Sequence, residues 1–179
     1  MRCRWPSRPA RAPTKRGSHP SAFVYPRPPT GPSCGIGPWT SSAAPPDYRA
    51  CFLHRDFHPG NVLFAEDGGD LWISGIVDWV ETSWGPADLD VAHCSTAMAL
   101  LHDAPAGMLF ADRYTAAGGR LTPDPAAHLY WRILDALAFA PDAEKVAGPW
   151  RELGRTDLTS TLLTSRLEDY LQELFNRYG

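Results

Sequence analysis

A short polar segment near position 55 carries side chains that could transfer a phosphoryl group. Residues 54–61 read HRDFHPGN, and Asp78 follows seventeen residues after Asn61, at the end of an apolar run. Phosphoryl transfer from ATP requires Mg²⁺, which prefers hard oxygen ligands, usually one or two carboxylates with phosphate oxygens and water. Asn61 and Asp78 are therefore candidate metal ligands. A separate carboxylate must accept or orient the proton of the attacking hydroxyl, and Asp56 is the candidate for that role.

These side chains come together only if the chain between them turns back on itself. Residues 62–64 predict a strand, residues 66–70 have the composition of a turn, and residues 71–73 and 75–78 predict a returning strand with a break at Ser74-Gly75. Such a hairpin would return Asp78 beside the loop that carries Asp56 and Asn61. The three oxygen-bearing side chains would then meet.

Helical patterns dominate after the hairpin. We expect helices over 87–101, with Pro86 in the first turn, over 105–117, and over about 156–177; another begins with Asp124 as N-cap and Pro125 in the first position. The expected buried stripes have helical spacing, namely Leu129, Tyr130, Ile133, Leu134 and Leu137 on one helix and Leu158, Leu162, Leu163, Leu167, Tyr170, Leu171, Leu174 and Phe175 on the last. The predicted class is α+β, mainly helical, with a small β-hairpin.

Three segments in order resemble the aminoglycoside phosphotransferase (phosphotransferase enzyme) family, which has a protein-kinase-like fold. Residues 54–63 resemble its catalytic loop, residues 76–79 its metal-binding segment, and residues 85–92 (GPADLDVA) the segment that follows. The resemblance implies Asp56 as catalytic base, Asn61 and Asp78 as Mg²⁺ ligands, and transfer of the ATP γ-phosphoryl group to a small-molecule hydroxyl. It also implies that Asp90 braces the catalytic loop by accepting backbone N–H bonds.

The family's smaller N-terminal, ATP-binding lobe has no counterpart that we identify in this sequence. About fifty residues precede the loop, without a Gly-rich strand-turn-strand, and Lys15 and Lys145 are the only lysines. The Lys that would hold the ATP phosphates is therefore expected to be missing. A truncated gene, a misplaced start site or an upstream frameshift would each leave this pattern. We accordingly expect the chain to be a fragment with weak activity or none.

Each candidate residue also has a plainer interpretation. Asp56, Asn61 and Asp78 could be ordinary loop and turn residues, although their order and spacing argue against this. His54 is better explained as a packed histidine bonded to backbone, a structural support of the loop like Asp90, than as a catalytic group. The i, i+4 spacing of His54 and His58 resembles a zinc motif, but Pro59 opposes a helix there. The remaining aromatic and helical candidates are expected to be packing residues: Trp79, Trp84, His93 and Cys94.

Charge and proline divide the chain near residue 50. Residues 1–50 carry eight Lys or Arg and one acid, whereas residues 51–179 carry nine bases and nineteen acids, and eleven of the eighteen prolines lie at or before Pro46. We expect residues 1–48 to be disordered and residues 49–179 to form the kinase-like lobe, with catalytic loop 54–61, metal-binding segment 76–79 and helical remainder 86–178. The four cysteines form no metal-binding or disulfide pattern, and no apolar run is long enough for a membrane span.

A cytoplasmic protein with Mg²⁺ and ATP as its cofactors, a small-molecule hydroxyl as its substrate and no membrane partner is the leading prediction. The first alternative is a non-catalytic, pseudokinase-like remnant that acts through a partner. The second is association with nucleic acid through the basic residues 1–50, which we expect less because such a segment is more often simply solvated.

Overall fold

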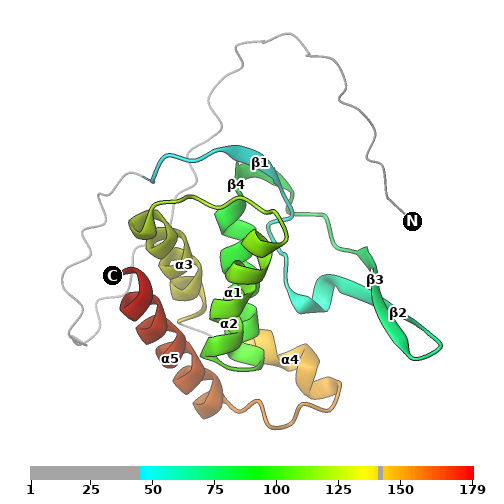
Figure 1. The fold of residues 1–179 in the computed structure, drawn as a ribbon. Helices are drawn as coiled ribbons and strands as arrows, with labels where there is room; N and C mark the ends of the chain where they lie inside the picture. The colour runs from blue at the N-terminus through cyan, green and yellow to red at the C-terminus, as the bar shows by residue number, and fades with distance from the viewer. Residues whose placement is uncertain (1–44, 141–142) are drawn as a thin grey trace, which may run out of the picture. The chain divides into compact units, whose positions relative to one another are not determined.

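A computed structural model describes residues 45–140 and 143–179. Their structure combines five helices with two small antiparallel sheets, so the predicted α+β class with helices dominating is confirmed. In chain order the elements are β1 (Ala50–Leu53), the 3-10 turn η1 (Pro59–Asn61), β2 (Val62–Asp67), β3 (Asp70–Ile76), β4 (Ser83–Pro86), α1 (Ala87–Leu101), α2 (Ala104–Ala116), α3 (Pro125–Phe139), α4 (Glu144–Glu152) and α5 (Ser160–Tyr178) (Figure 1).

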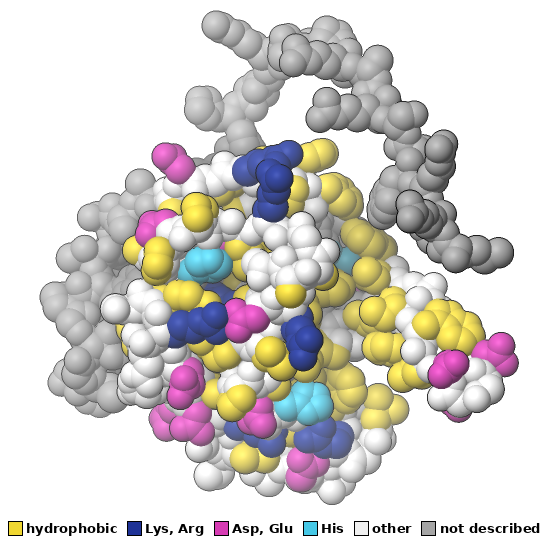
Figure 2. Space-filling view, in the orientation of Figure 1, with side chains coloured by type: hydrophobic (Ala, Val, Ile, Leu, Met, Phe, Trp, Pro, Cys, Tyr) yellow, Lys and Arg dark blue, Asp and Glu magenta, His cyan; other side chains and the backbone are white. Residues whose placement is uncertain are grey.

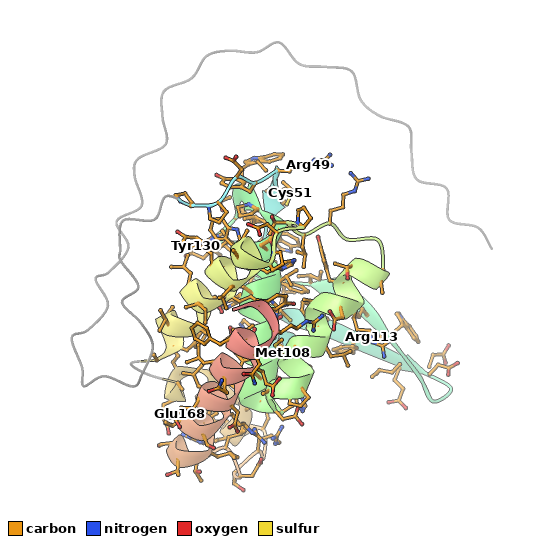
Figure 3. The ribbon with its side chains drawn as sticks, turned by 60° about the vertical axis from the view of Figure 1, so that its left-hand side comes forward. Arg49, Cys51, Met108, Arg113, Tyr130 and Glu168 are labelled. Atoms are coloured by element: carbon orange, nitrogen blue, oxygen red, sulfur yellow. The ribbon has the colours of Figure 1, made fainter. Side chains whose placement is uncertain are left out.

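Helix α1 is the centre of the helical part. It packs against α2, α3 and α5, and its residues are apolar or small on nearly every face, which is the pattern of a helix surrounded by other helices. Gly107 on α2 permits the closest approach, because a Cβ atom there would lie 2.6 Å from the backbone oxygen of Ser95. Met108, one residue further along α2, is buried in the same core (Figure 3).

Helix α5 closes the core with the apolar face that its sequence predicts. Leu163, Tyr170 and Leu174 are fully buried, and Leu167 is nearly so. Two arginines also tie this end of the chain to α1: Arg155 donates to the carbonyl of Leu101 over 3.0 Å and Arg166 to that of Leu100 over 2.8 Å. They satisfy carbonyls that the last turn of a helix leaves without an intrahelical donor.

The strands form two separate pairs. β1 pairs with β4, and β2 pairs with β3 to form the predicted hairpin. The hairpin turns at Gly68-Gly69, whose positive φ angles of 61° and 92° suit glycine in a tight two-residue turn. Its register shifts between Leu63 and Phe64, so that Ser74 is the extra residue on β3, at the position where the sequence predicted a break.

The hairpin leaves large apolar side chains uncovered. Figure 2 shows hydrophobic side chains gathered over it, and those more than a third exposed on its two strands are Leu63, Phe64, Leu71, Trp72, Ile73 and Ile76. Trp79 and Trp84 are also exposed, by 46% and 73%, so they are not core aromatics of the part of the chain that the structure describes. A two-stranded ribbon that exposes this much apolar surface has little stability of its own.

Two features of the fold were not predicted from the sequence, and two expectations were wrong. Helix α4 was not predicted, because Gly148 and Pro149 lie inside it and argue against a helix. The β1–β4 pair was also missed. Pro86 ends β4 and precedes α1 instead of lying within its first turn. On α3 the buried face is rotated from the predicted stripe: Leu137 is 47% exposed, whereas Arg132 is 2% exposed.

Other expectations concern the ends of the chain and membranes. The expected disorder of residues 1–48 falls almost wholly outside the described residues, as does the basic segment considered for nucleic-acid association. None of the described helices is long and apolar enough to cross a membrane.

Candidate active site

Asp90 fastens the segment 54–61 to helix α1. Its Oδ2 accepts the backbone N–H of His54 over 2.7 Å, and its Oδ1 accepts that of Arg55 over 2.8 Å. The carboxylate lies in the first turn of α1, where the helix dipole favours negative charge. Two short hydrogen bonds to Asp90 thus join this segment to α1.

His54 joins the same segment to residues 76–79. The residue is 3% exposed, and its Nε2 lies 2.8 Å from the carbonyl oxygen of Val77. Its Nδ1 accepts the backbone N–H of Asp56 over 3.3 Å, which leaves Nε2 to carry the proton and donate to Val77. Both ring nitrogens are used for backbone contacts, so His54 supports the site and is not placed to react.

Asp56 and Asn61 are in direct contact. The Asn61 Nδ2 group donates to the Asp56 backbone carbonyl over 2.8 Å and to Asp56 Oδ2 over 3.1 Å. Because the amide nitrogen is engaged by Asp56, the amide oxygen is the Asn61 side-chain atom that could bind a ligand. Asn61 itself is 9% exposed, whereas the Asp56 carboxylate is 39% exposed and open to a substrate.

Asp78 is brought to the site through the backbone. The N–H of Val77 donates to the carbonyl of Asn61 over 3.0 Å, which sets Asp78 one residue beyond a direct link to Asn61. Asp78 has φ of +63°, and Arg55, which precedes Asp56, has φ of +74°; they are the non-glycine residues of the described chain with positive φ. Such conformations cost about 1–3 kcal/mol each and gather at functional sites.

These residues fit a hard divalent cation. An amide oxygen from Asn61 and an exposed carboxylate from Asp78 are the protein ligands that Mg²⁺ accepts while it keeps water and phosphate oxygens. The part of the chain that the structure describes holds no group of three or more His, Cys, Asp or Glu side chains suited to a metal. A dedicated protein cage, such as a zinc site at His54 and His58, is therefore not present there, but Mg²⁺ at a phosphate-transfer site needs no such cage.

His93 is part of the site, although the sequence analysis placed it among packing residues. Its Nε2 lies 3.2 Å from Asp56 Oδ1, and its Nδ1 lies 3.0 Å from Oδ1 of Asp135 on α3. Burial lowers the pKa of His93, but its hydrogen bonds to Asp135 and Asp56 and their charges outweigh burial and hold the pKa above its ordinary value. The sequence held a signal for it: His93 follows Asp90 by one helical turn and so shares the face that meets the loop.

His58 has a different environment beside the same carboxylate. Its Nδ1 accepts the backbone N–H of Gly60 over 3.1 Å, which caps η1, and its Nε2 lies 3.7 Å from Asp56 Oδ1. Burial lowers the pKa of His58, against the opposing effect of Asp56. The environment of His58 therefore favours its neutral form, in contrast to that of His93. Cys94, next to His93, is buried as expected, and burial raises the pKa of its thiol to about 12.

An apolar cavity of about 210 Å³ lies behind the loop, between β1, α1 and α2. His54 and Asp90 border it, but their polar atoms are engaged in the contacts described above. Its other walls include Phe57, Phe110 and Tyr114.

The residues proposed from sequence lie together here, but no lysine of the described residues that could bind phosphate lies with them. Asp56, Asn61, His54 and Asp90 are linked by hydrogen bonds, and Asp78 adjoins them. Within residues 45–140 and 143–179, no strand carries a Lys, and Lys145 lies on α4 with its ammonium 4.4 Å from the centre of the Phe139 ring. Lys15 lies outside the described residues.

Comparison with known proteins places this site within a family pattern. A family model described as "Phosphotransferase enzyme family" matches residues 38–131, which is just over half of the 179 residues. The matched range contains β1, the site segments 54–61 and 76–79, and all of α1 and α2. Searches of curated proteins and of solved structures gave no match.

Proposed function

The chain belongs to the phosphotransferase enzyme family, and we propose that its described residues form the catalytic lobe of an ATP-dependent small-molecule kinase. The observation that carries the proposal is the Asp56 carboxylate, open to substrate, with one oxygen held by Asn61 beside the exposed Asp78. Family membership supports kinase-like phosphoryl transfer, and this arrangement supports the roles of the individual residues.

In the proposed reaction, Asp56 orients the acceptor hydroxyl and takes its proton. The hydroxyl oxygen then forms a bond to the γ-phosphorus as the bond from that phosphorus to the β–γ bridging oxygen breaks, and ADP leaves with that electron pair. Mg²⁺, when bound by Asn61 and Asp78, would neutralise charge on the phosphates. Asp90 and His54 hold the loop in place, so that little reorganisation accompanies the transfer.

The acceptor we propose is a hydroxyl of a small molecule. Residues 51–179 carry nine bases and nineteen acids, a balance compatible with a cationic acceptor such as an aminoglycoside. We place the reaction in the cytoplasm, where ATP is available; Cys51 and Cys94 are free thiols, as a reducing compartment favours.

As this chain stands, we expect phosphoryl transfer to be slow. Catalysis of this reaction depends mostly on positioning and charge stabilisation, and the described residues supply no lysine beside the site for the ATP phosphates. The same observation favours the second candidate, a non-catalytic remnant that acts through a partner. The intact set of Asp56, Asn61 and Asp78 favours the enzyme.

Two measurements on the purified chain separate the candidates. Transfer of labelled phosphate from ATP to a panel of hydroxyl acceptors is expected to be slow and to fall a further 10²- to 10⁴-fold in Asp56→Asn, with Asp67→Asn on the hairpin as the matched control. A thermal melt with millimolar MgATP is expected to show a raised midpoint, since a ligand of the native state stabilises it. Transfer equal in Asp56→Asn would contradict the catalytic role, and no transfer together with no shift would favour the remnant.

A further inference from the structure

His93 lies between two carboxylates that belong to different parts of the chain. Asp56 is on the catalytic loop and Asp135 is on α3, and their Oδ1 atoms lie 3.2 Å from Nε2 and 3.0 Å from Nδ1 of the His93 ring. The imidazole is largely buried, with a side chain 21% exposed. Both ring nitrogens thus meet a carboxylate oxygen, and the Asp135 side chain is itself only 14% exposed.

The two contacts together define the protonation state of the ring. A neutral imidazole has a single N–H and could donate to only one of the two carboxylates, whereas the imidazolium donates to both. The raised pKa of His93 agrees with the doubly protonated form. A cation held between two anions also forms charge-assisted bonds, which are stronger than neutral ones.

The other groups around His93 do not compete for these contacts. The catalytic loop presents His58, whose Nδ1 is occupied by Gly60 and whose pKa is lowered. Helix α3 presents Phe139, whose ring centre lies 5.5 Å from that of His93. The Lys145 ammonium lies over the Phe139 ring. Asp135 Oδ2 is buried and has no hydrogen-bond partner in the described part of the chain, so His93 is the contact that holds this carboxylate.

We propose that His93, clamped by Asp135, is a positioning residue that fixes the orientation of the Asp56 carboxylate. Asn61 holds Oδ2 of Asp56 and His93 holds Oδ1, so the carboxylate is restrained at both oxygens. The inference rests on the proposed role of Asp56 as base. It adds that α3, a helix without any residue of the sequence-predicted site, helps to determine the geometry of that base.

The proposed role of His93 predicts that its loss affects kcat and not the KM for ATP. Among the described residues the hydrogen bonds of His93 go to Asp56 and Asp135 and not to Asn61 or Asp78, so its loss is expected to misaim the base and to leave the metal ligands in place. Small misplacements of a reacting group reduce turnover strongly. His93→Gln is therefore expected to lower kcat by roughly 10- to 100-fold with little change in the KM for ATP.

The first test follows the His93 ring itself and needs no catalytic activity. NMR titration of the full chain with labelled histidine gives the pKa of each ring, and His93→Gln identifies the signal. We expect a His93 pKa above its ordinary value, lowered in Asp135→Asn and lowered again, independently, in Asp56→Asn. His102→Gln, at an exposed position after α1, is the matched control and should leave the His93 titration unchanged.

Each result decides between the two proposals. A His93 titration that does not respond to Asp56→Asn would overturn the positioning role, whatever the activity of the chain. A response without measurable phosphoryl transfer and without a MgATP-dependent shift in the thermal melt would support the clamp on Asp56 and favour the remnant over the enzyme. Where transfer is measurable, a kcat of His93→Gln equal to that of His102→Gln would also overturn the positioning role, because the clamp would then not matter for the reaction.

Discussion

Leu163 on α5 is fully buried, whereas Leu71 on β3 is 67% exposed, and each leucine represents the region that carries it. The helices turn their apolar faces toward one another around α1 and form a closed core. The β2–β3 hairpin presents apolar side chains outward, on a ribbon against which no described helix packs broadly.

The site lies between these two regions and depends on both. Asp90 and His93 reach it from α1. Asn61 directly precedes the first strand of the hairpin, and Asp78 lies two residues after the end of its second strand. One half of the site is therefore held by a well-packed helix. The other half is carried by the β2–β3 hairpin. This two-stranded ribbon exposes much apolar surface and has little stability of its own.

The largest expected effect tests the closed core. Leu163→Ala removes a side chain that is fully buried among α5 and its neighbours, and it should lower the free energy of unfolding by about 2–5 kcal/mol. The matched change Leu71→Ala on the hairpin should alter it by no more than about 0.5 kcal/mol. Urea unfolding followed by circular dichroism measures both, and equal losses would erase the contrast between the regions.

A smaller effect is expected where the regions meet. In Asp90→Asn only one oxygen remains to accept the backbone N–H groups of His54 and Arg55, and the negative charge is lost. The free energy of unfolding should fall by about 1–3 kcal/mol, and hydrogen exchange at those two amides should accelerate. Glu168→Gln, at an exposed position on α5, is the control (Figure 3). Unchanged exchange at both amides would show that Asp90 does not brace the loop.

A third effect depends on pH. The pKa of His93 is raised in the folded chain, so its contribution to stability is complete below the unfolded value of about 6.5. That contribution is lost as the pH rises through the higher folded pKa, and we expect a loss of about 1 kcal/mol. Unfolding measured across this window should show the loss in the wild-type chain and not in His93→Gln. Parallel curves for the two chains would contradict it.

The smallest effect on stability is expected on the hairpin surface. Trp72→Ser and Ile73→Ser exchange side chains that are 46% and 62% exposed, so each should change the free energy of unfolding by no more than about 0.5 kcal/mol. Each should nevertheless reduce the fluorescence of a dye that binds exposed apolar surface. A loss of stability above about 1 kcal/mol would mean that these side chains are covered in solution.

The sequence predicted most accurately those features that are encoded locally. The hairpin follows from apolar runs on either side of Gly68-Gly69, and α1 matches its predicted range of 87–101. Asp124 caps α3 as expected, with its side chain accepting the N–H of Ala126 over 3.2 Å. The resemblance to the phosphotransferase enzyme family is confirmed by the family match. The assigned roles of the site residues remain predictions.

Features set by distant contacts could not be predicted in the same way. Phe52 on β1 pairs with Trp84 on β4, and the residues of the site lie between these two strands in the sequence. Nothing in either short segment indicates its partner. The face of α3 is determined by its neighbours, which bury Arg132 beside Tyr170 and leave Leu137 exposed. The contact of His93 with Asp135 likewise requires the packing of α1 on α3, although its contact with the loop was implied by Asp90.

The arginine bonds at the end of α1 have a consequence for synthesis on the ribosome. Arg166 follows its partner Leu100 by 66 residues, a distance that takes about 3–13 seconds to translate. Asp56, Asn61 and Asp78 are synthesised before α1, and the Leu100 carbonyl of α1 meets its arginine only when α5 has been made. The nascent chain thus displays its apolar hairpin before the last helix of the core that surrounds α1 has been made.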